Sequence, residues 1–228
     1  MIIATQSVLQ LAKQELSGNH SHTSPDSLIA NLIHLLESHD ALSASHAIGV
    51  ALQADAIAIG MEMNSDHRQK LWRAALMHDI GKLDVPAEIL RSASSLNPEA
   101  LKMIRRHPAV GAELMERSAA LRELAPFVRH HHERWDGTGY PSNLRGEEIP
   151  LEARIIGLCD AVHSMSMTRP YQGARPADQI IREVERCAGS QFDLALVAVF
   201  RRSRGTMIFV PSTTRASHPT PAFAIVGR

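Results

Sequence analysis

Histidine and carboxylate side chains gather at two places in this sequence, and each gathering could bind a metal ion. His78 and Asp79 stand side by side after an apolar, helix-like run and directly before Ile80-Gly81-Lys82. The second gathering is His130-His131-His132-Glu133, which is followed by Asp136-Gly137-Thr138-Gly139-Tyr140-Pro141. A carboxylate can bridge two cations while an adjacent imidazole binds one of them. An adjacent His and Asp occur by chance in many proteins, so the interpretation depends on both clusters together.

Three further residues of ligand type stand alone along the chain: His46, His107 and Asp160. A lone histidine in the first turn of a helix, as expected for His46, is usually an ordinary polar residue. His107 precedes Pro108 at the junction of two expected helices, where a side chain can point into a cavity. Asp160 lies in an expected helix that is apolar on nearly every side. A carboxylate there is unfavourable unless it is paired or binds a cation.

Aliphatic residues and alanine dominate the composition and aromatic residues make up only 4%, which favours packed helices over a β-sandwich or barrel. Apolar periodicity predicts helices over 6–16, from about 27, over 40–60, from the turn at 64–66 up to 79, from 98 to about 106, from 107 onward, and over 121–132, 151–165, 175–188 and 193–201. Ser43 or Ser45 is expected to cap the helix over 40–60, and Gly81 to end the helix before it. The Gly- and Pro-rich stretch 133–150 is expected to be a functional loop.

The chain has 228 residues, which is enough for one domain with modest extensions. Its net charge of zero indicates no nucleic-acid polymer and no membrane surface as a partner. No apolar run approaches the ~20 residues that span a bilayer, and the first residues lack the basic region of a signal peptide. Cys159 and Cys187 are expected to be reduced core thiols of a cytoplasmic protein.

Taken together, the pattern resembles the HD-GYP family, the branch of HD-domain metal phosphohydrolases that acts on cyclic di-GMP. The resemblance runs from about Asp40 to Phe200 and rests on His46, His78-Asp79-Ile80-Gly81-Lys82, His107-Pro108, His131-His132-Glu133-Arg134-Trp135-Asp136-Gly137-Thr138-Gly139-Tyr140-Pro141 and Asp160. It implies an all-α HD-domain helical bundle with an irregular Gly-Tyr-Pro loop. We accordingly divide the chain into an N-terminal helical extension (1–38), an HD-GYP domain (39–201) and an Arg-rich C-terminal tail (202–228).

The resemblance implies two divalent metal ions. The ligands that match the family are His46, His78, Asp79 and Asp160 for one ion, and Asp79 as a bridge with His107, His131 and His132 for the other. His130 is taken as a flanking residue. Imidazole and carboxylate ligands suit iron or manganese, with zinc as a further option, rather than calcium. Such a pair of ions activates a water near neutral pH and stabilises charge on a phosphate.

The resemblance also implies substrate contacts, and it makes Asp79 and Lys82 the expected catalytic residues. Lys82 matches a family lysine on the scissile phosphate, although an exposed cation at a helix end is the plainer interpretation. Arg169 matches a phosphate-binding arginine, with a helix C-cap as its plainer interpretation. The substrate loop is expected to be shaped by Asp136, Gly137, Gly139 and Tyr140. In the family this loop is also associated with contacts to diguanylate cyclase (GGDEF) domains.

The leading hypothesis is a phosphodiesterase that hydrolyses cyclic di-GMP to linear pGpG or onward to GMP, and a homodimer is kept open. The sequence departs from the family at several positions. Leu42 replaces a Glu that recruits a third metal in some members, His163 replaces a second Asp, and Gln172 and Gly173 replace basic residues. These losses motivate an alternative, a catalytically weak regulatory module that binds a ligand or a cyclase partner. A third option, an HD phosphohydrolase for other nucleotides or phosphomonoesters, is disfavoured by the Gly-Tyr-Pro loop.

Overall fold

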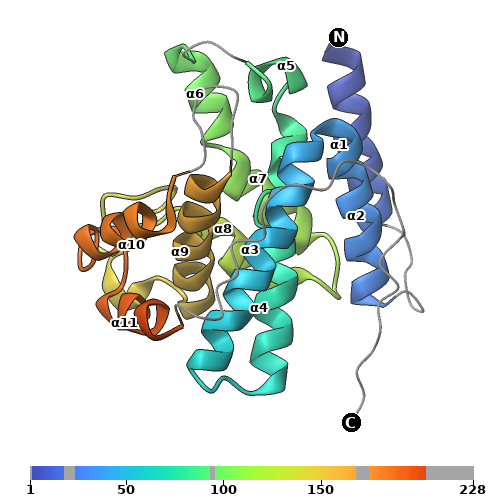
Figure 1. Cartoon of the computed structure of the whole chain (residues 1–228). Helices are drawn as coiled ribbons and strands as arrows, with labels where there is room; N and C mark the ends of the chain where they lie inside the picture. Colours follow the sequence, from blue (N-terminus) through green and yellow to red (C-terminus); the bar gives the residue numbers. More distant parts are fainter. Residues whose placement is uncertain (1, 18–23, 93–95, 168–174, 204–228) are drawn as a thin grey trace.

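The structure is a computed structural model that describes residues 2–17, 24–92, 96–167 and 175–203. Within these ranges the chain forms helices and no strand, which confirms the all-α expectation. One isolated β-bridge joins Ala188 and Phe192. The α-helices and 3-10 helices (η) in Figure 1 are α1 (Ile2–Ser17), α2 (Pro25–His39), α3 (Ala41–Gly60), α4 (Ser65–Met77), η1 (Ile80–Asp84), α5 (Ala87–Leu90), α6 (Pro98–Ile104), α7 (His107–Glu116), η2 (Arg122–Leu124), α8 (Ala125–His130), η3 (Gly146–Glu148), α9 (Leu151–Ser166), α10 (Ala177–Arg186) and α11 (Leu194–Arg202).

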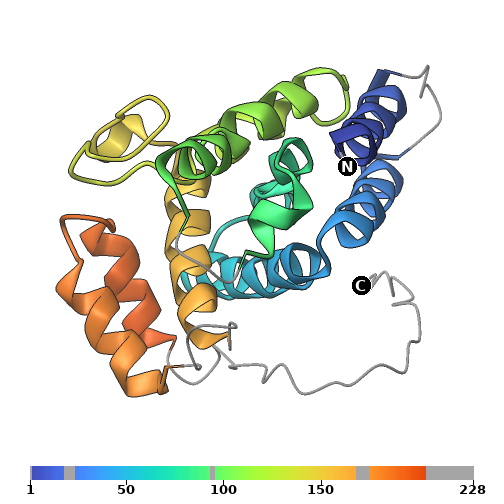
Figure 2. The same ribbon diagram turned by 90° about the horizontal axis from the view of Figure 1, so that it is seen from above.

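The helices form a ring around a central segment. Seen from above in Figure 2, α4 and η1 lie inside a ring made by α1, α2, α3, α9, α8 and α7. The central segment contacts most of this ring, including α2, α3, α8 and α9 from α4, and α1 and α7 from η1. The pair α10 and α11 lies outside the ring next to α9 (Figure 2). His78 and Asp79, which lie between the end of α4 and the start of η1, are therefore placed in the middle of the molecule.

The longest helix, α3, would be long and apolar enough to cross a membrane by length and composition alone. Slightly more than half of its apolar window (56%) is buried inside the fold. It packs against α2, α4 and α9, and Val50, Ala54 and Ile57 are fully buried in the shared core. These contacts are those of a core helix.

Polar side chains cap two helices. Asn64 and Asn97 cap α4 and α6 through their side chains, beside the starts predicted at the turn 64–66 and at 98. The prediction that Ser43 or Ser45 caps α3 is wrong, because the helix already begins at Ala41. The hydroxyl of Ser43 instead donates to Asp40 Oδ2 at 2.6 Å.

Gly81 does not end the helix before it, contrary to the sequence expectation. The α-helix ends at Met77, and the chain continues through His78 and Asp79 into η1. A Cβ at Gly81 would collide with the carbonyl oxygen of His107 and the backbone nitrogen of Gly111. The glycine is needed because η1 and α7 touch backbone to backbone, and this contact brings His107 close to Asp79.

The helix expected over 121–132 is shorter than predicted. It begins as η2, and α8 itself runs only from Ala125 to His130 with a proline in its first turn. Proline has no N–H and its ring clashes with the preceding turn, so α8 cannot extend backward through Pro126. At its other end α8 stops at His130, so His131 and His132 lie just beyond the helix, where the chain turns.

Candidate metal centre

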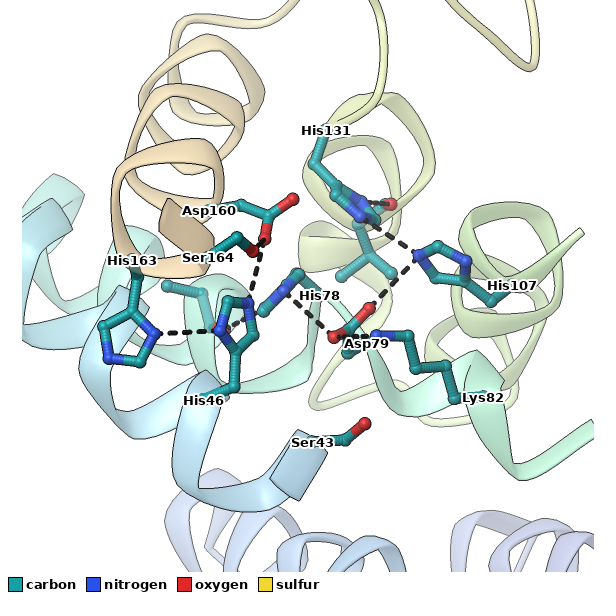
Figure 3. Close-up of polar contacts among 12 residues, drawn as sticks. Ser43, His46, His78, Asp79, Lys82, His107, His131, Asp160, His163 and Ser164 are labelled. Carbon is teal, nitrogen blue, oxygen red and sulfur yellow. Dashed lines mark hydrogen bonds and ion pairs between the residues drawn. The ribbon is translucent and has the colours of Figure 1, made fainter. Parts of the chain in front are cut away.

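The predicted metal ligands come from five segments that meet in the middle of the bundle (Figure 3). These segments are α3, the turn after α4, the start of α7, the turn after α8, and α9, which supply His46, His78 with Asp79, His107, His131 with His132, and Asp160 in that order. Five of the seven are almost fully buried, and the side chain of Asp160 is 19% exposed. The residues that the resemblance assigned to one centre therefore do lie together.

The ligand atoms form two groups. The first group contains His46, His78 and Asp79, and the second contains His107, His131 and His132; within each, one ligand atom per residue lies within 4.8 Å of the others. Asp160 adjoins the first group, because its Oδ1 is 2.9 Å from His46 Nε2. The first group therefore consists of His46, His78, Asp79 and Asp160, and the second group of His107, His131 and His132.

Asp79 lies between the two groups. Its Oδ2 is 3.4 Å from Nε2 of His78 in the first group. Its Oδ1 is 3.2 Å from Nε2 of His107 in the second group. One carboxylate oxygen thus faces each group, which is the arrangement that a carboxylate bridging two cations requires.

Three imidazoles are oriented by the main chain in the same way. The Nδ1 atoms of His78, His107 and His131 each lie 2.7 Å from the carbonyl oxygen three residues earlier. A carbonyl only accepts, so each Nδ1 carries the proton and each Nε2 is left with a lone pair. All three Nε2 atoms are thereby prepared to bind a cation.

The Nε2 atoms of His78, His107 and His131 contact no hydrogen-bond donor in the described part of the chain. Nε2 of His78 is buried without one. Nε2 of His107 and Nε2 of His131 are 3.3 Å apart, and neither has a proton to donate. Buried lone pairs in this arrangement are unfavourable unless a cation neutralises them. The donor set therefore fits divalent metal ions.

The electrostatics of Asp79, His131 and His132 favour the protonation states that metal binding requires. Burial would raise the pKa of Asp79, but the charges of Lys82 and His78 outweigh it and hold that pKa well below its usual range. Burial lowers the pKa of His132 to about 4 and that of His131 well below its ordinary value. Near neutral pH the carboxylate is ionised and these imidazoles are neutral, as ligands must be.

Lys82 lies one turn beyond the ligands, on η1. Its Nζ donates to Asp79 Oδ2 at 2.6 Å, and its side chain is 22% exposed. The ammonium group is thus held at the edge of the centre rather than pointing freely into solvent, and it reaches both the Asp79 carboxylate and water.

The Gly-Tyr-Pro loop meets the centre through Tyr140. The Tyr140 ring stacks on His132, with centroids 4.9 Å apart, and a cis peptide bond joins it to Pro141. The carboxylate of Asp136 instead accepts hydrogen bonds from Arg134 and Thr138 of its own loop. It therefore shapes the loop from within.

Both loop glycines occupy positions that favour glycine. Gly137 has a positive φ of 79°, and a Cβ at Gly139 would collide with the backbone of Glu133 and Arg134. Arg169 lies outside the described residues. Of the predicted substrate contacts, Lys82 and Tyr140 are thus the ones placed beside the ligands.

Sequence reasoning missed several neighbours of the centre. Ser164 donates to Asp160 Oδ1 at 3.2 Å, and its spacing of four residues on one helix could have indicated this. The guanidinium of Arg105 lies 5.5 Å from the centroid of the Tyr140 ring, with no sequence signal to reveal it. The buried carboxylate of Glu133 accepts from the backbone N–H of Ser142 at 2.6 Å and so anchors the loop.

His130 and a neighbouring cavity complete the surroundings. Nδ1 of His130 lies 3.6 Å from Glu133 Oε1, and His130 belongs to neither ligand group. A cavity of about 260 Å³ reaches His132 and Asp160 from the side of α9, and its lining includes Trp135. A small part of a substrate could enter there, next to the ligands.

The sequence is similar to an HD domain family model and to proteins named as cyclic dinucleotide phosphodiesterases. The sequence model described as "HD domain" matches residues 30–196. A Thermotoga maritima protein named cyclic di-GMP phosphodiesterase is 33% identical over 168 residues, which cover 73% of this chain and 46% of that protein. A Vibrio cholerae protein named 3'3'-cGAMP-specific phosphodiesterase 3 is 32% identical over 74% of this chain and 37% of its own length. The chain thus spans less than half of these relatives.

A solved structure from Bdellovibrio bacteriovorus, described as an HDG"Y"P protein, shares the fold. It superposes with a TM-score of 0.59 at 17% identity, covering 89% of this chain and 64% of that one. HD domains bind divalent metals, and the two groups described above have the composition to do so. By its sequence match, the chain belongs to the HD domain family.

Proposed function

We propose that this chain is a metal-dependent phosphodiesterase that hydrolyses cyclic di-GMP to linear pGpG, with GMP as a further product. The observation that carries the proposal is the position of Asp79, one oxygen of which faces each ligand group at 3.2 to 3.4 Å. The centre would hold two divalent ions, either iron or manganese, with zinc as a further option. The first group with Asp160 would hold one ion, and the second group with Asp79 the other.

The chain's own groups would bind and orient the phosphate. A pair of divalent cations supplies an activated water and neutralises the charge that develops on the phosphate. Lys82 Nζ, 2.6 Å from Asp79, is within reach of a phosphate oxygen placed over that carboxylate. Burial raises the pKa of Tyr140, so its hydroxyl stays protonated and donates a hydrogen bond to an incoming acceptor. Arg105, which lies over the same ring, adds positive charge at this entrance.

The substrate class rests on the similar proteins. Their names assign cyclic di-GMP to one relative and 3'3'-cGAMP to another, and both substrates are cyclic dinucleotides. Hydrolysis of 3'3'-cGAMP is therefore the second candidate function. We further propose the cytoplasm as the location, consistent with free, buried Cys159 and Cys187, and the Gly-Tyr-Pro loop as a surface for a GGDEF domain or a second copy.

We also propose that residues 39–201 are the catalytic unit, between the extension 1–38 and the tail 202–228. The HD domain match over 30–196 supports the main boundaries. Fully buried Leu28, Leu32 and Leu36 of α2 belong to the same core as the rest of the bundle. The extension would therefore stabilise the catalytic unit rather than fold separately.

The test is product analysis with metal-loaded protein. Protein purified with Mn²⁺ or Fe²⁺ is incubated separately with cyclic di-GMP, 3'3'-cGAMP and a phosphomonoester, and products are separated by chromatography, with Asp79→Ala as the control. The proposal expects pGpG from cyclic di-GMP and no product from the control. Tight binding without turnover would favour the regulatory module instead. Turnover of the phosphomonoester alone would favour a different HD phosphohydrolase.

A further inference from the structure

His46 is oriented differently from His78, His107 and His131. Its Nδ1 does not use a main-chain carbonyl but lies 2.8 Å from Nδ1 of His163 on α9. The two rings are 4.8 Å apart between centroids and inclined at 59° (Figure 3). On the other side, His46 Nε2 faces Asp160. His163 is thus the group behind a proposed ligand.

We propose that His163 is a positioning residue for His46. Its Nδ1 accepts a hydrogen bond from the Nδ1–H of His46, which leaves Nε2 of His46 free to bind a cation. The inference deepens the proposed function and rests on its metal centre. Hydrogen bonds of this kind fix the tautomer and ring orientation of metal-binding histidines.

An imidazole in this position can do what a carbonyl or a carboxylate cannot. Without a cation, His46 Nε2 donates to Asp160 Oδ1 at 2.9 Å, and its Nδ1 then needs a donor. When a cation is bound, His46 Nε2 uses its lone pair to bind it, so Nδ1 carries the proton and needs a hydrogen-bond acceptor. His163 serves both states by carrying its proton on either ring nitrogen, whereas a carbonyl or an ionised carboxylate only accepts.

The helix that carries His46 also provides the space for His163. A Cβ at Gly49, three residues after His46, would lie 1.9 Å from Nε2 and 2.5 Å from Cδ2 of the His163 ring. Only glycine leaves room for the ring against α3 at this point. Gly49 and the Nδ1–Nδ1 contact are separate observations, and both place His163 behind His46.

A matched pair of variants tests the role of the acceptor. In His163→Asn, the side-chain oxygen takes the place of Nδ1 and keeps an acceptor for His46. His163→Leu keeps comparable bulk without one. Gly49→Ala displaces the ring while leaving His163 unchanged. The readout is Mn²⁺ binding to metal-free protein, measured from the electron paramagnetic resonance signal of free Mn²⁺, with circular dichroism to confirm folding.

We expect wild type to bind two Mn²⁺ ions. His163→Leu and Gly49→Ala should weaken one of them by about 10- to 100-fold, while His163→Asn stays within about threefold of wild type and all variants remain folded. Wild-type affinities in His163→Leu, or equal losses in the Leu and Asn variants, would overturn the role of His163 alone. Absence of Mn²⁺ binding by wild type would overturn the metal centre, and this inference with it.

Discussion

The two ligand groups are held in place by different means. In the second group, main-chain carbonyls of Ile104 and Val128 orient His107 and His131. In the first group, other side chains orient two of the ligands, since His163 contacts His46 and Ser164 contacts Asp160. A carbonyl is fixed by the path of the chain, whereas a side chain can be exchanged by a single mutation. The first group should therefore be the more sensitive to substitution around it.

The largest effect should come from the residue that the groups share. Asp79→Asn keeps the shape of the side chain but removes the negative charge that faces both groups. Because metal ions supply several kcal/mol of stabilisation to phosphate chemistry, we expect hydrolysis to fall by about 10³-fold or more, and Mn²⁺ binding to weaken in both groups. Initial rates and Mn²⁺ titration measure the two effects. Activity within tenfold of wild type would show that the groups do not share this carboxylate.

Lys82 tests whether a neighbour of Asp79 serves the substrate rather than the metal. Lys82→Gln removes the charge but keeps a donor of similar length. We expect kcat/KM to fall by about 10²-fold, because a charged donor to the phosphate is lost, while the number of bound Mn²⁺ ions stays at two. Arg68→Gln, which breaks an ion pair with Asp55 on α3, is a matched surface control. A loss of metal equal to the loss of rate would assign Lys82 to metal binding instead.

Acid should destabilise the metal-free protein mainly through the second group. The pKa of His132 is about 4 in the folded protein, against an ordinary value of 6.5, and that of His131 is also lowered. The unfolded chain therefore binds more protons between these values, so the free energy of unfolding falls as pH decreases from 6.5 to 4. His132 alone contributes on the order of 3 kcal/mol.

His78 of the first group opposes this trend. Burial disfavours the charged form of His78, but the Asp79 carboxylate raises its pKa above the ordinary value, so it contributes stability that is lost as pH rises. Urea unfolding of chelator-treated protein at several pH values measures the sum. A free energy of unfolding that is constant or rises between pH 6.5 and 4 would contradict the assignment of neutral imidazoles to the second group.

The smallest effect should come from Ser164→Ala. It removes one 3.2 Å hydrogen bond to Asp160 Oδ1, which keeps its contact with His46. We expect Mn²⁺ affinity to fall by about threefold in one site, and Ser166→Ala, whose hydroxyl instead bonds the His163 carbonyl, to change it less. Equal effects of the two serine variants would remove Ser164 from the support of the first group.

The sequence allowed the candidate ligand residues to be singled out better than the residues that contact them. His78 and Asp79 were recognisable because motif residues of fixed types stand at fixed spacings. The contact of His163 with His46 joins α9 to α3 across 117 positions, and no spacing rule connects such distant residues. The role of Arg105 at Tyr140 likewise depends on how α6 and α7 are placed. Local patterns reveal residue types, whereas these supports arise only from packing.

The predictions for the helix ends show the same contrast between local and distant interactions. The starts of α4 and α6 were predicted correctly because each follows a local interaction, in which the side chain of Asn64 or Asn97 caps the next turn. Gly81 was assigned the wrong role, since its neighbour is the backbone of α7, far along the chain. Ser43 was also misjudged, because α3 begins earlier than the first serine.

The most direct test of a dinuclear centre is a crystal structure of the protein grown with Mn²⁺, with anomalous diffraction to locate the ions. The account predicts two peaks about 3.5–4 Å apart, one bound by His46, His78 and Asp160, the other by His107, His131 and His132, with one oxygen of Asp79 on each. A single ion, or two ions that do not share Asp79, would contradict it.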